Sequence, residues 1–175
     1  MAHQADQYLT IAIQYYVAGR TALIAHLGPV CGNILHHAAE MLLKFFLLKS
    51  HTPEELRDQF GHDLKKLWRA PKQQQKDAAL ARFDTTISTL NLIEDLRYPG
   101  NYGYVLMMDL QKGPRHYAKG PAVKGMTQHY VNLEDIDEFF TTLLSGRVTP
   151  EWVRGLLLKP EAKSQYADQN KHPFF

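Results

Sequence analysis

Residues 94–104, "EDLRYPGNYGY", bring charged and phenolic side chains together at the end of an apolar helical pattern. Glu94 and Arg97 are three residues apart, and Tyr102 and Tyr104 follow a proline–glycine break. Arginine can bind a phosphate through two parallel hydrogen bonds, and tyrosine can stack on a base or donate a hydrogen bond. This stretch therefore predicts a corner that binds a phosphate or a nucleotide. The alternative is a simple ion pair between Glu94 and Arg97 at a helix end.

A second group of polar residues interrupts the most apolar predicted helix, at about residues 30–49. Its members are Asn33, His37, Glu40 and Lys44. At about 100° per residue, this spacing places all of them within one narrow stripe of the helix surface. Such a stripe is either the solvated side of the helix or the lining of a site inside a helical bundle. The sequence leaves both interpretations open.

Three histidines near these groups could also do chemistry. His36 and His37 lie within one helical turn of Glu40, a spacing that metal ligands use. Metal sites in bundles take a Glu-x-x-His pair from a further helix, and no such partner is present. We therefore expect no metal site and no cofactor. His62, which follows Gly61, is a candidate base if the chain cleaves a substrate, and a structural residue otherwise.

The elements that must position these residues are helices. Apolar residues recur at three- and four-residue steps along much of the chain, and "HTPEEL" has the cap, proline and glutamate of a helix start. The predicted helices cover residues 5–26, about 30–49, a short helix from Thr52, about 72–97, one beginning at Asn132, and a short one from Thr149 to about Leu158. The fold class is therefore all-α, a four- to five-helix up-and-down antiparallel bundle.

Residues 100–131 lack the helical period and predict one long loop or hairpin insertion in this bundle. The insertion carries Lys112, Arg115, Lys119 and Lys124, with His116 and Tyr117 among them. This run is either a solvated loop or a nucleic-acid patch. Residues 1–158 are predicted to form a single domain, and residues 159–175 a polar C-terminal tail.

The composition of the chain limits the classes of function that it can have. With 45% hydrophobic and 22% charged residues in a chain of 175, the sequence is that of one globular domain. The formal net charge of +2 means that any nucleic-acid affinity must come from a local patch. One cysteine, Cys31, excludes an internal disulfide and fits a reducing compartment. Since no stretch has the length of a membrane span, we expect a cytoplasmic protein.

Five motifs, in order along residues 5–145, resemble the HEPN superfamily. They are "YYVAGRTAL", "HHAAEMLLKFFL", "GHDLKKLW", "EDLRYPGNYGY" and "VNLEDIDEFFTTLL". The resemblance implies an up-and-down helical bundle that forms a homodimer, with its site where the helix carrying the arginine meets its mate. Many members are metal-independent ribonucleases that use an arginine, a spacer of four to six residues and a histidine, often followed by x-Tyr.

This chain departs from that pattern at the histidine. Arg97 matches the arginine, but Tyr102 stands at the histidine position and Tyr104 at the trailing tyrosine. Tyrosine, with an ordinary pKa of about 10, is a poor base at neutral pH. The resemblance therefore implies a nucleotide- or RNA-phosphate-binding module with a degenerate ribonuclease motif. Its expected ligand-binding residues are Arg97, Tyr102, Tyr104, Glu40, Lys44 and Glu94.

Two other functions remain open at this point. The first is an active, metal-independent endoribonuclease of toxin type in which His62 or His116 replaces the missing histidine and Arg97 binds the phosphate. A nucleotidyltransferase-like or antitoxin protein would then be its partner. The second is a dimeric structural or partner-binding helical bundle without a small-molecule site.

Overall fold

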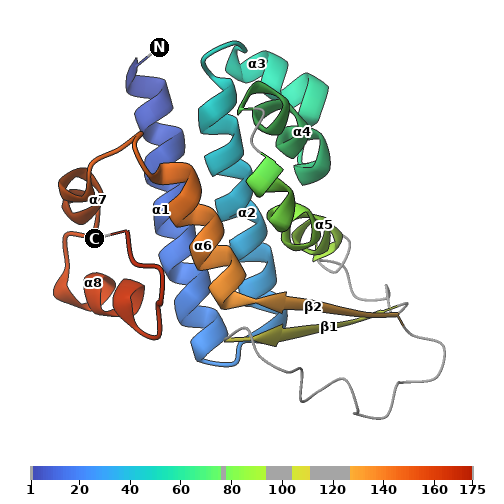
Figure 1. The fold of residues 1–175 in the computed structure, drawn as a ribbon. Helices are drawn as coiled ribbons and strands as arrows, with labels where there is room; N and C mark the ends of the chain where they lie inside the picture. The colour runs from blue at the N-terminus through green and yellow to red at the C-terminus, as the bar shows by residue number, and fades with distance from the viewer. Residues whose placement is uncertain (1, 76–77, 94–103, 111–126, 175) are drawn as a thin grey trace.

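The computed structural model describes residues 2–75, 78–93, 104–110 and 127–174 (Figure 1). The helices are α1 (Ala2–Ile24), α2 (Gly28–Leu47), α3 (Pro53–Glu55), α4 (Leu64–Gln75), α5 (Asp84–Ile93), α6 (Leu133–Leu144), α7 (Pro150–Leu156) and α8 (Pro160–Ala167). A π-helix, η1 (Leu56–Phe60), follows α3, and a 3-10 helix, η2 (Ala78–Phe83), precedes α5. The strands are β1 (Tyr104–Asp109) and β2 (Thr127–Asn132). The predicted helical fold is confirmed.

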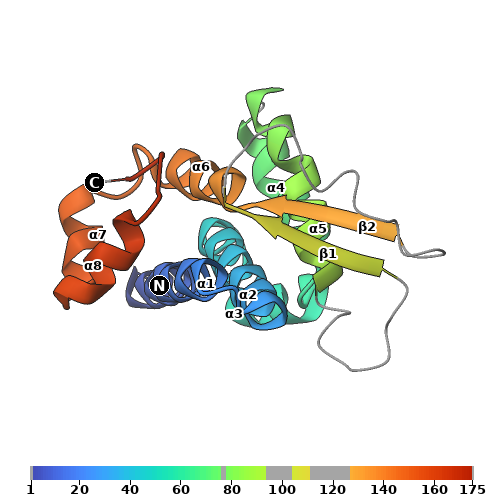
Figure 2. The ribbon, with the colours of Figure 1, turned by 90° about the horizontal axis from the view of Figure 1, so that it is seen from below.

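Helices α1 and α2 form the centre of the bundle and lie side by side (Figures 1 and 2). Only three residues separate them, so they must run antiparallel. Gly19 permits their close approach, because a Cβ at this position would lie 2.7 Å from the side chain of Leu35. Helices α4 and α5 pack on the other side of α2.

Aromatic rings join the remaining helices to this pair. Phe140 of α6 stacks on Tyr16 of α1, with ring centroids 4.1 Å apart. Phe139 meets Trp68 of α4 and Phe83 of η2 edge to face, at 5.6 and 5.5 Å. These are favourable geometries for aromatic pairs. One apolar core is therefore shared by α1, α4, η2 and α6.

The prediction of one long helix over residues 72–97 is wrong. α4 continues through Pro71 to Gln75, and the 3-10 helix η2 precedes α5 (Asp84–Ile93). Leu80 and Phe83 are both buried, and their three-residue spacing fits a 3-10 helix as well as an α-helix. Apolar spacing alone therefore could not reveal the break.

The insertion contains a pair of parallel strands. Tyr104 pairs with Thr127 at one end of the register, and Asp109 pairs with Asn132 at the other. Because a hairpin joins antiparallel strands, the hairpin alternative is wrong. β2 runs directly into α6. Asn132 occupies the predicted N-cap position, but its amide donates to the Asp135 carboxylate instead of accepting from the helix backbone.

The segment after residue 158 is not the predicted polar tail. It forms α8 and then returns along α1 and α6, and Tyr166 is buried against Tyr16. The segment carries too few apolar residues for its sequence to show a period. No helix among the described residues has the length and apolar character that a bilayer crossing requires.

Candidate functional site

Three polar side chains gather around the Glu40 carboxylate, and we call His37, Glu40, Lys44 and His62 the Glu40 cluster. Glu40 is 1% exposed. Lys44 Nζ donates to its Oε1 at 2.6 Å, and His62 Nδ1 lies 3.1 Å from both carboxylate oxygens. His37 Nδ1 lies 3.3 Å from Oε2. Since Glu40 and Lys44 are buried, the solvated-face interpretation of the stripe is wrong for both.

Local geometry explains how the chain brings His62 to this place. Thr52 and Glu55 form the predicted capping box at the start of α3, and η1 then ends at Gly61. Gly61 has φ +55° and ψ −122°, a conformation that glycine adopts far more easily than other residues. Asp63 accepts from Lys66 N at 3.1 Å, so it caps α4. The turn that carries His62 is held at both ends.

The electrostatic balance at Glu40 favours the carboxylate. Burial by itself raises its pKa, but hydrogen bonds from Lys44 and His62 outweigh this and hold the pKa below its ordinary value. The His62 side chain is 59% exposed and that of His37 is 31% exposed. A buried, ionised carboxylate therefore holds two imidazoles that reach the surface.

Two tyrosines of α1 lie beside the cluster and were missed as site residues. The Tyr15 ring is 5.8 Å from the His37 ring, and burial, Glu40 and Glu54 together raise the pKa of Tyr8. In the sequence both belong to the apolar pattern of α1. Tyr15 is nevertheless 41% exposed, a property that the pattern did not reveal.

The structure brings together three of the predicted site residues: Glu40, Lys44 and the candidate base His62. Tyr104 is the first residue of β1, and its side chain is outside the described part of the chain. Glu94, Arg97, Tyr102, His116, Lys112, Arg115, Lys119 and Lys124 also lie outside the described residues. The expectation that Glu40 and Lys44 share one binding site with Arg97 and Tyr102 therefore remains a prediction.

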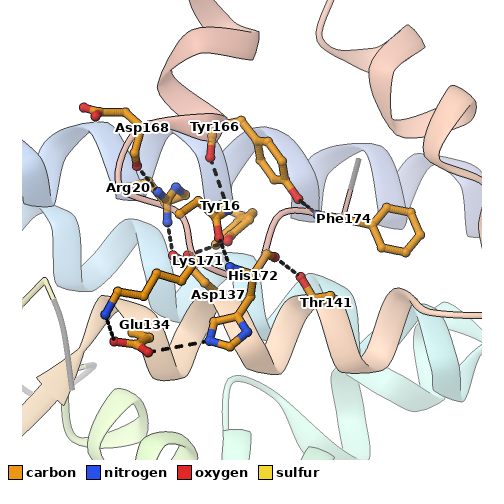
Figure 3. Close-up of polar contacts among 11 residues, drawn as sticks. Tyr16, Arg20, Glu134, Asp137, Thr141, Tyr166, Asp168, Lys171, His172 and Phe174 are labelled. Atoms are coloured by element: carbon orange, nitrogen blue, oxygen red, sulfur yellow. Dashed lines mark hydrogen bonds and ion pairs between the residues drawn. The ribbon is translucent and has the colours of Figure 1, made fainter.

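A second polar cluster lies between α1, α6 and the C-terminal segment (Figure 3). Arg20 is 0% exposed and donates to the Asp137 carboxylate and to the carbonyl oxygen of Asp168. Tyr16 donates to Asp137 Oδ1 at 2.5 Å. We call Tyr16, Arg20 and Asp137, with the C-terminal residues that cover them, the Arg20 cluster. The sequence alone did not predict this cluster, although a lone arginine in an apolar helix pattern is a signal of such a pair.

The C-terminal segment closes the Arg20 cluster. Thr141 donates to the carbonyl oxygen of His172 at 2.5 Å, and Tyr166 Oη accepts from Phe174 N at 2.6 Å (Figure 3). Lys171 Nζ lies 3.2 Å from the Glu134 carboxylate. The charges of Arg20 and Asp137 are therefore paired with other groups of the protein itself, and we assign this cluster a structural role.

Comparisons of the chain with protein-family models, with curated proteins and with solved structures found no match. The resemblance to the HEPN superfamily therefore remains a prediction based on the five sequence motifs.

Proposed function

We propose that the chain is a HEPN-like module that binds the phosphate of a nucleotide or RNA at the Glu40 cluster and cleaves RNA poorly. One observation carries this proposal. His62 is more than half exposed, yet its ring is held 3.1 Å from both oxygens of a buried carboxylate. An exposed ring with a fixed orientation is the arrangement expected of a residue that contacts a ligand.

The bond to Glu40 determines which nitrogen serves the ligand. His62 Nδ1 donates to the carboxylate, so Nε2 is the atom left for a bound group. When the ring is protonated, Nε2 donates to a phosphate oxygen. Lys44 balances the charge of Glu40, so the carboxylate repels a bound anion less.

Arg97, Tyr102 and Tyr104 enter this proposal from the sequence alone. The last described turn of α5 packs on the N-terminal half of α2. His36 Nδ1 donates to the Leu90 carbonyl at 2.9 Å, and a Cβ on Gly32 would lie 2.9 Å from the Ile93 side chain. Arg97 follows four residues after this end of α5.

The pairing of Glu40 with His62 also favours the second candidate, a ribonuclease in which His62 is the base. In the neutral ring, Nδ1 donates to Glu40 while the lone pair of Nε2 can accept the proton of a ribose 2′-hydroxyl. The carboxylate then has the role of the aspartate in a Ser-His-Asp triad, which orients the imidazole and stabilises its charged form.

The binding proposal is tested with fluorescently labelled short RNAs and with ATP, in a buffer that contains EDTA. His62→Ala and Arg97→Ala should each weaken binding by about tenfold or more, as expected for the loss of a hydrogen bond to a charged group. His26→Asn is the matched control, since it removes an exposed imidazole in the turn between α1 and α2. Equal affinity in all four proteins would contradict the proposal.

Cleavage assays separate the two candidates. If Tyr102 marks a degenerate nuclease motif, Tyr102→His should create RNA cleavage that Arg97→Ala then abolishes. If the wild-type protein already cleaves RNA and His62→Ala lowers the rate by about 10²- to 10⁴-fold, His62 is the base and the second candidate is correct.

A homodimer is part of the proposal, and the surface of α1 supports it. Ile11 and Tyr15 are one helical turn apart and are 40% and 41% exposed. Apolar side chains adjacent on one helix face are typical of surfaces that self-associate. Light scattering at micromolar concentration should give twice the mass of the chain, and Ile11→Glu should shift that mass toward the monomer.

A further inference from the structure

One oxygen of the Glu40 carboxylate faces ring nitrogens of three histidines. Oε2 lies 3.1 Å from His62 Nδ1, 3.3 Å from His37 Nδ1 and 3.9 Å from His36 Nε2. The Lys44 ammonium is bonded to the other oxygen, Oε1. Oε1 is therefore bonded to Lys44 and also faces His62, whereas Oε2 faces three imidazoles.

These distances match the spacing of ligands around a small cation. The ligand atoms of His37, Glu40 and His62 all lie within 4.8 Å of one another. Zinc binds nitrogen and oxygen at about 2.0–2.2 Å, so neighbouring ligands of a tetrahedral ion are about 3.3–3.5 Å apart. The two shortest N···O distances at Oε2 are already close to that value. The ligand nitrogens of His37 and His62 lie within 4.8 Å of one another, so an ion bonded to all three atoms requires side-chain rotations that bring these two rings together.

The three side chains are also positioned before any ligand arrives. His37 and Glu40 are three residues apart on α2 and therefore lie on one face of a helix with a buried core. His62 comes from the turn that Gly61 and Asp63 hold in place. Preorganised ligands on rigid elements are what distinguish a metal site from a chance group of polar side chains.

We propose that His37 Nδ1, Glu40 Oε2 and His62 Nδ1 bind one divalent transition-metal ion of the Zn²⁺ class. Two imidazoles with one carboxylate favour zinc and its neighbours over Mg²⁺ and Ca²⁺, which prefer oxygen ligands alone. Three protein ligands leave a fourth position for water or a phosphate oxygen, as in zinc sites that do chemistry. The exposure of His62 makes this position accessible from solvent. Metal binding here does not depend on the proposed nucleotide binding.

The sequence predicted no metal site, because it contains no Glu-x-x-His pair on a second helix. The third ligand comes instead from a turn, 22 residues from Glu40 along the chain. No helical periodicity links these two positions.

The test uses the full chain without an affinity tag, stripped of metal by a chelator. Zn²⁺ is titrated in competition with a chromophoric chelator, and Co²⁺ is used as a spectroscopic probe. We expect one ion per chain and the visible absorption of a tetrahedral Co²⁺ site. His62→Ala should lower the Zn²⁺ affinity by at least about 100-fold, more than the 10- to 100-fold typical of losing a hydrogen-bonding partner of a ligand. His26→Asn should leave the affinity unchanged.

Lys44→Met separates this site from the phosphate site. It removes a positive charge next to the carboxylate, so Zn²⁺ should bind more tightly while RNA, measured in EDTA, should bind no more tightly than to wild type. Circular dichroism confirms that each variant is folded, and His62→Ala changes a largely exposed side chain. Zn²⁺ affinity that is the same in wild type, His62→Ala and His37→Ala would overturn the metal site and leave the phosphate proposal standing.

Discussion

The Glu40 cluster and the Arg20 cluster are built from the same kinds of parts but differ in what covers them. Each has a carboxylate, on α2 or α6, that is 1% exposed and bonded to a basic side chain. In the Arg20 cluster, α8 and the chain end cover the pair, so the arginine is also fully buried (Figure 3). In the Glu40 cluster, His62 lies at the surface.

Because the two clusters differ in solvent exposure, we assign a structural role to the Arg20 cluster and a binding role to the Glu40 cluster. Burial is the dominant influence on Asp137 and raises its pKa above the ordinary value, although Arg20 and Tyr16 act against it. At Glu40 the partners outweigh burial and the pKa is lowered. The first carboxylate is enclosed, whereas the second holds groups that a ligand can still reach.

The largest effect should come from Arg20→Met. This change leaves the Asp137 carboxylate buried without its counter-charge, and we expect a loss of about 3–5 kcal/mol in the free energy of unfolding. Urea denaturation monitored by circular dichroism measures it. Arg20→Met/Asp137→Leu should cost less than the sum of the single changes, because the two charges are coupled. A loss below about 1 kcal/mol for Arg20→Met would show that this pair is not the structural cluster described above.

Tyr166→Ala tests whether the C-terminal segment covers the Arg20 cluster in solution. Tyr166 is 3% exposed, and truncating a buried aromatic residue costs about 3 kcal/mol or more. The same urea titration measures the loss. Leu158→Ala is the control, because Leu158 is 81% exposed and its truncation should change stability by less than about 0.5 kcal/mol. If Tyr166→Ala behaves like the control, the predicted polar tail was the better description.

Glu40→Gln should destabilise less than Arg20→Met but affect binding more. We expect a loss of about 1–3 kcal/mol in stability, because Lys44 loses a charged partner while His62 can turn to water. RNA affinity and Zn²⁺ affinity should both fall. Arg20→Met, in contrast, should leave both affinities unchanged at temperatures where it is folded. Equal binding losses in the two variants would remove the distinction between the clusters.

The smallest effect concerns Asp84, an exposed carboxylate that belongs to neither cluster. Burial raises its pKa, but the hydrogen bonds from Lys72 and Trp68 and the Lys72 charge together outweigh this and hold the pKa below its ordinary value of 3.8. A lowered pKa stabilises the fold above pH 4, and this contribution is lost as the pH falls through 3.8 and below. Asp84→Asn should therefore cost roughly 0.5 kcal/mol at pH 7 and nothing near pH 2. A constant difference between the two proteins across this range would contradict the assignment.

Local features of the sequence were sufficient for much of the fold and part of the site. The Thr52 capping box, the turn at Gly61 and the Asp63 cap all depend on interactions within a few residues, and the predicted helix start at Thr52 is confirmed. The stripe that contains Glu40 and Lys44 follows from helical phase alone. The break between α4 and α5 could not be predicted, because a 3-10 turn keeps the apolar spacing.

Tertiary structure alone decided which polar groups meet. Helical phase determines the direction in which a side chain points from its own axis, and that much is contained in the sequence. Which residue of another element faces it depends on packing and on the path of the connections. Thus Glu40 meets His62 across 22 residues, and Arg20 meets Asp137 across 117. The docking of the C-terminal segment, which covers one cluster and leaves the other open, depends on the same long-range packing.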